Sequence, residues 1–143
     1  MQNFYARPLN SGARWLAVAA LVVAGAAHLP VIGEHLEEAP YMGVLFIVLT
    51  AACFALAAAM ISFDPPVVYA LAVLTCGLAI VGYAATRTVA FPQLADDVGN
   101  WFEPLGVVSV LSEALAVAVA GRVVTGRPVV RERRPHPVAI ASR

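Results

Sequence analysis

The stretch that decides the fold is residues 41–63, YMGVLFIVLTAACFALAAAMISF, which contains no charged side chain. A bilayer core about 30 Å thick is crossed by a helix of roughly 17–25 residues. Three further apolar stretches of spanning length occupy residues 15–32, 65–86 and 104–121, and only the last contains a charge, Glu113. The runs are continuous and lack the alternation of a membrane barrel. The sequence therefore predicts four membrane-spanning helices.

The composition of the whole chain agrees with this interpretation. Of its 143 residues, 61% are hydrophobic and 13% are charged, and the mean hydropathy is +0.81. A soluble domain is roughly 45–50% apolar and about 25% charged. So little charge is not enough to cover the large relative surface of a short soluble chain. The composition disfavours a soluble enzyme, a nucleic-acid-binding domain, a disordered protein and a disulfide-rich secreted domain.

The formal net charge of zero hides an ordered distribution of 9 basic and 9 acidic residues. Every basic residue is Arg, and all except Arg87 lie in residues 1–14 or 122–143. Basic segments mark the cytoplasmic side of a membrane protein, so both termini are expected in the cytoplasm. We expect a cytoplasmic N-terminus (1–14), a four-helix transmembrane domain (15–121) and a flexible, Arg- and Pro-rich cytoplasmic tail (122–143). The expected location is the cytoplasmic (inner) membrane of a bacterium.

The connections between the apolar stretches predict the topology. Residues 64–66, Asp-Pro-Pro, form a tight inner turn, because Pro opens helices and disfavours helix just before it. Residues 33–40 are expected to form a short outer loop. Apolar residues at helical spacing in residues 87–103 predict a short amphipathic helix on the outer surface, between the third and fourth helices. With small residues on the helix faces, the expected fold is an all-α, antiparallel four-helix membrane bundle.

Glu113 is the most informative single residue of the apolar stretches. An ionised carboxylate at the middle of a membrane helix costs at least a few kcal/mol, so this side chain should face the bundle interior and be protonated, paired or ligating. Ser109, one turn before it, and Ser112, directly before it, are expected to hydrogen-bond it. Arg87 lies on the same face of its predicted helix as Tyr83. Its side chain can extend outward from the membrane, or it can pair with Glu113 or with Glu34. A Glu113 that only holds helices together is the structural alternative.

A second group of polar residues lies in residues 28–38, HLPVIGEHLEE. Imidazole and carboxylate ligands suit zinc, copper or iron. The predicted metal site has His28 and His35 as nitrogen ligands and Glu34, Glu38 or Glu113 as carboxylate ligands. The side chains expected around these ligands are Arg87, Tyr83, Ser109 and Ser112. The alternative is a solvated acidic loop, with His28 hydrogen-bonded at a helix interface.

Cys53 and Cys76 both lie inside apolar stretches. Each is about ten residues from the inner turn, which places both thiols about 15 Å above it. Thiols at matched depth can bind a soft metal such as copper(I). The other interpretation is two independent buried thiols. A b-type haem needs axial ligands at suitable depth, and His28 is the only histidine of a predicted span.

The pattern of the outer-face residues resembles uncharacterised small four-helix integral membrane proteins of actinobacteria. The resemblance covers most of residues 15–121 and implies a four-span fold without an activity. The residues that carry it are His28, Glu34, His35, Glu38, Pro40, Tyr41, Gly43, Phe46, Thr86, Arg87, Phe91, Pro92, Gln93, Asp96, Asp97, Val98, Gly99, Trp101, Glu103, Pro104, Leu105, Gly106 and Glu113.

Three functional hypotheses follow from the sequence. The first is a non-enzymatic binding or accessory protein with an outward-facing His/Glu/Arg site that binds a transition metal. The second is a small proton-coupled transporter that uses Glu113, with Arg87 as counter-charge. The third is a membrane redox or lipid-acting enzyme subunit with Tyr83 and His28 near its substrate. The expected partners are membrane lipids and other membrane subunits or further copies of the chain, and not nucleic acid.

Overall fold

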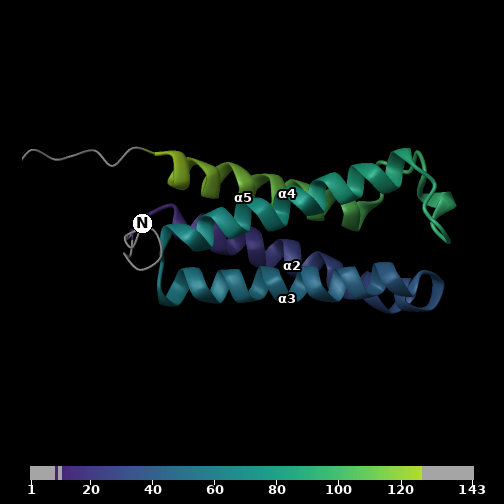
Figure 1. The fold of residues 1–143 in the computed structure, drawn as a ribbon, viewed down its shortest axis with the longest axis horizontal. Helices are drawn as coiled ribbons and strands as arrows, with labels where there is room; N and C mark the ends of the chain where they lie inside the picture. Colours follow the sequence, from purple (N-terminus) through teal and green to yellow (C-terminus); the bar gives the residue numbers. More distant parts are fainter. Residues whose placement is uncertain (1–8, 10, 127–143) are drawn as a thin grey trace, which may run out of the picture.

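The fold of the chain is described by a computed structural model that covers residue 9 and residues 11–126. Within this part of the chain, four long helices follow one another: α2 (Arg14–Glu38), α3 (Pro40–Ser62), α4 (Pro66–Thr88) and α5 (Pro104–Thr125) (Figure 1). The predictions for the N-terminal segment and the C-terminal tail fall largely on residues 1–8, 10 and 127–143, outside the described residues.

The helices begin where the sequence places proline. Pro40, Pro66 and Pro104 each occupy the first turn of a helix. Proline suits this position because its φ angle is already helical and its missing N–H has no intrahelical acceptor there. All four helices are long and apolar enough to cross a membrane. The four predicted spans are therefore confirmed as helices, with ends shifted by a few residues.

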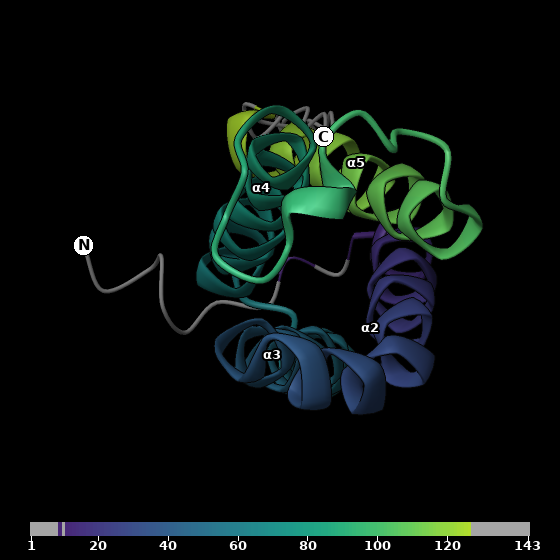
Figure 2. The ribbon, with the colours of Figure 1, turned by 90° about the vertical axis from the view of Figure 1, so that its right-hand side faces the viewer.

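The helices pack as a ring around one core. Helix α2 lies beside α3 and α5, and α4 lies beside the same two helices; the end-on view in Figure 2 shows this four-cornered arrangement. Small side chains dominate the core and let the backbones approach closely. Its buried members include Ala17, Ala20, Ala24, Ala57, Ala72, Ala116 and Ala120, and its largest side chains are Leu21, Met60 and Tyr69. The all-α four-helix bundle is confirmed.

The outer surface of the bundle carries large apolar side chains on every helix. Val48, Leu78 and Leu111 are 60%, 63% and 65% exposed. Soluble monomers rarely expose large contiguous apolar patches, whereas hydrocarbon chains solvate such a surface well. Together with the length and composition of the four helices, this surface makes the chain a multi-pass membrane protein.

The predicted loop at residues 33–40 is wrong, because α2 continues to Glu38 and only Ala39 separates it from α3. Pro30 lies inside the helix without ending it. Residues 34–38, after Gly33, are Glu-His-Leu-Glu-Glu, and Leu and Glu are good helix formers. The last turns of α2 also pack on the start of α3, where the Leu36 side chain and backbone lie against Gly43. Propensity and packing together extend the helix through Gly33.

The predicted amphipathic helix in residues 87–103 is also wrong. This segment contains only a short 3₁₀ helix, η1 (Ala95–Asp97). Gln93 has φ 65° and Gly99 has φ 83°, and these left-handed conformations interrupt a helix on both sides of η1. The loop is held to the bundle by backbone bonds, since the Gly99 N–H donates to the Arg87 carbonyl at 3.0 Å. The Tyr41 hydroxyl donates to the Pro92 carbonyl at 2.6 Å.

The turn between α3 and α4 contains a buried carboxylate, Asp64, which is 1% exposed. It accepts hydrogen bonds from the Tyr69 hydroxyl and from the Ser11 N–H, the latter at 3.1 Å. Arg14 Nη1 lies 3.8 Å from its Oδ2, and the Leu9 N–H donates to its carbonyl at 3.0 Å. The start of the described chain is therefore fixed at this end of the bundle. The tight turn was predicted, but the network around Asp64 was missed; Arg14 at the start of the first apolar stretch was its only sequence signal.

Candidate functional site

A buried polar cluster joins α2 to α5 in the membrane-spanning part of the bundle. It consists of His28, Ser109 and Glu113, which are 7%, 6% and 1% exposed. Ser109 and Glu113 lie one turn apart on α5, so both face α2, the helix that packs beside them. The prediction that Glu113 faces the bundle interior is confirmed by this placement.

Short contacts connect the three side chains in a row. Ser109 Oγ lies 3.0 Å from Glu113 Oε1 and 3.3 Å from His28 Nε2. The direct separation of His28 Nε2 and Glu113 Oε1 is 3.9 Å. On the other side of the imidazole ring, Nδ1 lies 2.8 Å from the Ala24 carbonyl oxygen. We call this arrangement the His28–Ser109–Glu113 chain.

The position of one proton in this chain follows from its partners. A carbonyl oxygen only accepts hydrogen bonds, so His28 Nδ1 must carry a proton and donate to Ala24. His28 Nε2 is then the variable end of the ring. It accepts a hydrogen bond when the imidazole is neutral and donates one when the ring is an imidazolium.

Two arrangements of protons satisfy the whole chain, because Ser109 has a single hydroxyl proton. In the ionic arrangement, Nε2–H donates to Ser109 Oγ and the Ser109 hydroxyl donates to an ionised Glu113. In the neutral arrangement, a protonated Glu113 donates to Ser109 Oγ and the Ser109 hydroxyl donates to Nε2. The two differ only by the passage of a proton along Ser109. The chain is therefore able to hold one proton at either end.

Ser112 does not join this chain, although it was expected to hydrogen-bond Glu113. Its hydroxyl donates to the carbonyls of Val108 and Ser109, each at 2.8 Å. Serine in a helix commonly donates to the backbone carbonyl one turn before it, and Ser112 makes this local bond in place of one to Glu113.

Arg87 and Tyr83 contact the loop between α4 and α5 and not Glu113 or Glu34. Arg87 is 7% exposed; its Nη1 lies 2.5 Å from Asp97 Oδ1 and its Nη2 lies 3.5 Å from Glu103 Oε2. Its guanidinium also lies 4.7 Å from the Tyr83 ring centroid. The Tyr83 hydroxyl donates to the Trp101 carbonyl at 2.8 Å. These contacts fix the loop between α4 and α5 over the end of the bundle.

Phe46 of α3 packs against both histidines of α2. Its ring centroid lies 5.0 Å from that of His28 and 4.8 Å from that of His35. The two histidines are seven residues apart, or about 10 Å along the helix axis, whereas a metal binds its nitrogen ligands at about 2 Å. His35 Nδ1 lies 2.9 Å from the Val31 carbonyl. The structure therefore separates the two predicted nitrogen ligands.

The five predicted metal ligands are divided among three places. His28 and Glu113 share the buried chain, His35 lies beyond Phe46, and Glu34 and Glu38 are exposed at the end of α2. Across residue 9 and residues 11–126, no three His, Cys, Asp or Glu side chains are grouped so that they could hold one ion. Metal binding by these five residues stays a prediction.

Comparison with known proteins adds no relative of this chain. No protein-family model, no curated protein and no solved structure matches it.

Proposed function

We propose that this membrane protein moves protons across the bilayer, as the proton-binding part of a small proton-coupled transporter. The observation that supports the proposal is the buried His28–Ser109–Glu113 chain, which has two satisfied proton arrangements inside a membrane-spanning bundle. Ionisable residues within membrane spans are costly and mark ion pathways and proton relays. The basic end segments orient the protein with both termini in the cytoplasm.

Loss of the exchangeable proton from the His28–Ser109–Glu113 chain weakens the packing of α2 against α5. With an ionised Glu113 and a neutral His28, Oε1 and Nε2 are both acceptors and compete for the one Ser109 hydroxyl proton. One acceptor is then left buried without a donor, which costs about 1–3 kcal/mol, and more for a charged group. Water entering between α2 and α5 relieves that cost. Proton release therefore favours opening of this helix interface.

The outer side offers the route to the chain. His35 is half-buried near the outer end of α2, and Phe46 lies against both His35 and the buried His28. The Thr50 hydroxyl, one turn further along α3 from Phe46, is buried and has no hydrogen-bond partner among the described residues. On the other side of His28, α2 presents the buried alanines of the tight core. We infer that protons enter past Phe46.

Proton flux into lipid vesicles tests this function. Purified protein is reconstituted with a pH-sensitive dye inside the vesicles, and an inward proton gradient is imposed with charge compensation by a potassium ionophore. Wild-type protein is expected to acidify the interior faster than protein-free vesicles do. Glu113→Gln should reduce the rate to that of protein-free vesicles, because an amide cannot release the proton.

The matched control is Ser112→Ala, on the same helix and one residue from Glu113. Its hydroxyl bonds only carbonyls of α5, so this variant should keep the wild-type rate. Equal flux in wild type and Glu113→Gln would contradict the proposal, and so would wild-type flux no faster than that of empty vesicles.

A further inference from the structure

A cleft of about 510 Å³ lies between the start of α2 and the last two turns of α5. Its walls are mainly apolar, with Leu9 and Leu16 on the α2 side and Val119 and Val123 on α5. Leu9 and Leu16 are 41% and 50% exposed, so the cleft opens on the outside of the bundle. Ligand sites of proteins commonly measure roughly 300–1,000 Å³ and are lined mainly by apolar side chains. The cleft therefore has the size and the lining of a ligand site.

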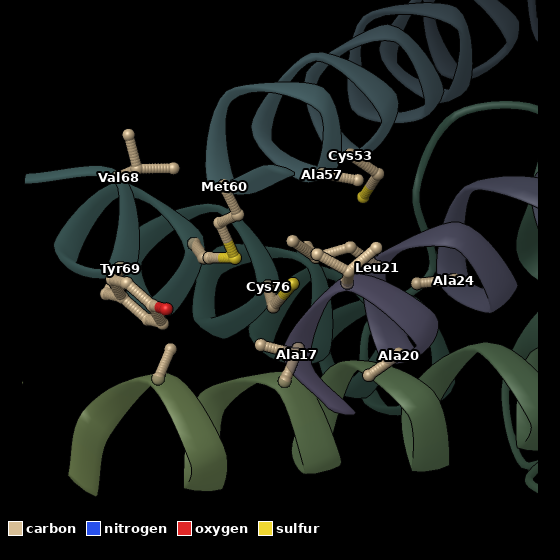
Figure 3. Packing of buried hydrophobic residues seen from close by; sticks show 14 residues of the cluster. Ala17, Ala20, Leu21, Ala24, Cys53, Ala57, Met60, Val68, Tyr69 and Cys76 are labelled. Atoms are coloured by element: carbon tan, nitrogen blue, oxygen red, sulfur yellow. The ribbon is translucent and has the colours of Figure 1, made fainter. Parts of the chain in front are cut away.

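The cleft lies on the surface of the bundle, and the core behind it is closed. Ala17 and Ala20 of α2 follow Leu16, and Ala120 of α5 follows Val119. These three alanines are 0%, 3% and 0% exposed within the packed core (Figure 3). An occupant of the cleft therefore approaches from outside, where hydrocarbon chains surround the membrane-spanning helices. An acyl chain suits such an apolar wall.

Arg122 adds a positive charge to the apolar cleft. In the described part of the chain, Arg14 and Arg87 form ion pairs with carboxylates, whereas no ion pair there includes Arg122. Arg122 lies within the last turn of α5, which ends at Thr125. The ends of spanning helices lie near the polar headgroups, and long basic side chains extend towards that interface. The charge in the cleft thus complements an anionic headgroup.

We propose that this cleft binds one anionic phospholipid, with an acyl chain along the apolar wall and the phosphate beside Arg122. Basic pockets between membrane helices on the cytoplasmic side bind the headgroups of anionic lipids. The basic end segments predict that this end of the bundle is cytoplasmic. The bound lipid joins α2 to α5. The site uses no residue of the His28–Ser109–Glu113 chain and does not depend on the proposed movement of protons.

Native mass spectrometry of the full chain in detergent tests the lipid site. The protein is titrated with dioleoylphosphatidylglycerol, or with dioleoylphosphatidylcholine, which has the same acyl chains and a zwitterionic headgroup. Wild type is expected to retain one phosphatidylglycerol per chain and to prefer it by about fivefold, the contribution expected of one Arg beside an anionic headgroup. Arg122→Gln should bind the two lipids equally, and Arg122→Lys should keep the preference.

Two leucine variants test the apolar wall. Leu16→Gln places a polar amide in the cleft and should weaken retention of both lipids. Leu111→Gln is the matched control, because Leu111 is 65% exposed on α5 and lies outside the cleft, so lipid binding should not change. Circular dichroism confirms that each variant remains folded. Glu113→Gln should keep the lipid even though it abolishes proton flux, so failure of one proposal is distinguishable from failure of the other.

Three results would overturn the lipid site. The first is equal retention of the two lipids by wild type, and the second is an unchanged preference in Arg122→Gln. The third is a wild-type dimer that retains no lipid and dissociates in Leu16→Gln, which would identify a second copy of the chain as the occupant of the cleft.

Discussion

At the scale of single residues, the described part of the chain buries two carboxylates, Asp64 and Glu113, which differ in their hydrogen-bonding and charged partners. Asp64 lies in the turn between α3 and α4, with Arg14 and the Tyr69 hydroxyl as partners. Glu113 lies within a membrane span, where its partners are Ser109 and, beyond it, His28. A permanent cation and several donors hold Asp64 in one state, whereas the partners of Glu113 can exchange a proton with it. This contrast predicts a structural role for Asp64 and supports the function proposed for Glu113.

Removal of Asp64 is expected to destabilise the protein. Asp64→Ala deprives the Tyr69 hydroxyl and the Ser11 N–H of their acceptor. Hydrogen bonds to a charged group contribute about 1.5–3 kcal/mol each, so the loss of two should lower the free energy of unfolding by about 3–6 kcal/mol. Thermal unfolding in detergent, followed by circular dichroism, measures the loss. Asp96→Ala, at an exposed position of the outer loop, should change it by less than about 0.5 kcal/mol; equal effects of the two substitutions would refute the assignment.

The sequence identified the residues of the His28–Ser109–Glu113 chain, but it did not predict which side chains contact one another. His28, Ser109 and Glu113 stand out because polar residues are rare in apolar stretches. Which of them meet depends on how α2 and α5 pack, and one sequence does not contain that information. Ser112 is adjacent to Glu113 in the sequence and Ser109 is four residues before it, yet only Ser109 bonds Glu113, because the Ser112 hydroxyl donates to the carbonyls of Val108 and Ser109. Arg87 was matched with the wrong acids because the loop that brings Asp97 and Glu103 to it has no regular periodicity.

At the scale of helices, the sharp corner between α2 and α3 depends on Gly43. A Cβ atom at this position would lie 2.7 Å from Leu36 Cγ and 2.8 Å from the Leu36 backbone nitrogen. A backbone atom cannot move aside as a flexible side chain can. The absence of a side chain at residue 43 is therefore what lets two long helices meet across a single residue, Ala39.

Gly43→Ala is expected to open this corner. Overpacking of this kind costs about 1–3 kcal/mol in the free energy of unfolding. Gly33→Ala is the matched control, because it lies in the neighbouring helix with no atom within 4 Å of an added Cβ. It should be neutral or should stabilise α2 by about 0.5–1 kcal/mol. Urea or thermal unfolding of both variants measures the difference, and similar stability of the two would show that the close contact is unimportant.

The helices themselves were predictable, but the α2–α3 and α4–α5 connections were not. Apolar length defines a span because the bilayer sets it, so four spans follow from hydropathy alone. The end of α2 depends on its packing against α3, and the outer loop depends on left-handed residues such as Gln93, which the sequence does not mark. The helical spacing of apolar residues in residues 87–103 was therefore not sufficient to predict a helix.

At the scale of the whole molecule, the protein is a bundle with a different character at each end. The end at which α2 begins carries the Asp64 network, with Arg14. The opposite end is covered by the loop between α4 and α5, which Arg87 fixes through Asp97 and Glu103. Between them, the His28–Ser109–Glu113 chain joins α2 to α5.

The central claim is that the His28–Ser109–Glu113 chain holds an exchangeable proton. Infrared difference spectroscopy of the purified protein during a pH titration tests it most directly, because the C=O stretch of a protonated carboxyl group is distinct from that of a carboxylate. The account predicts one buried carboxylic-acid band that appears and vanishes reversibly with pH, shifts in Ser109→Ala and is absent from Glu113→Gln. An identical band in Glu113→Gln, or no such band in wild type across the titration, would contradict it.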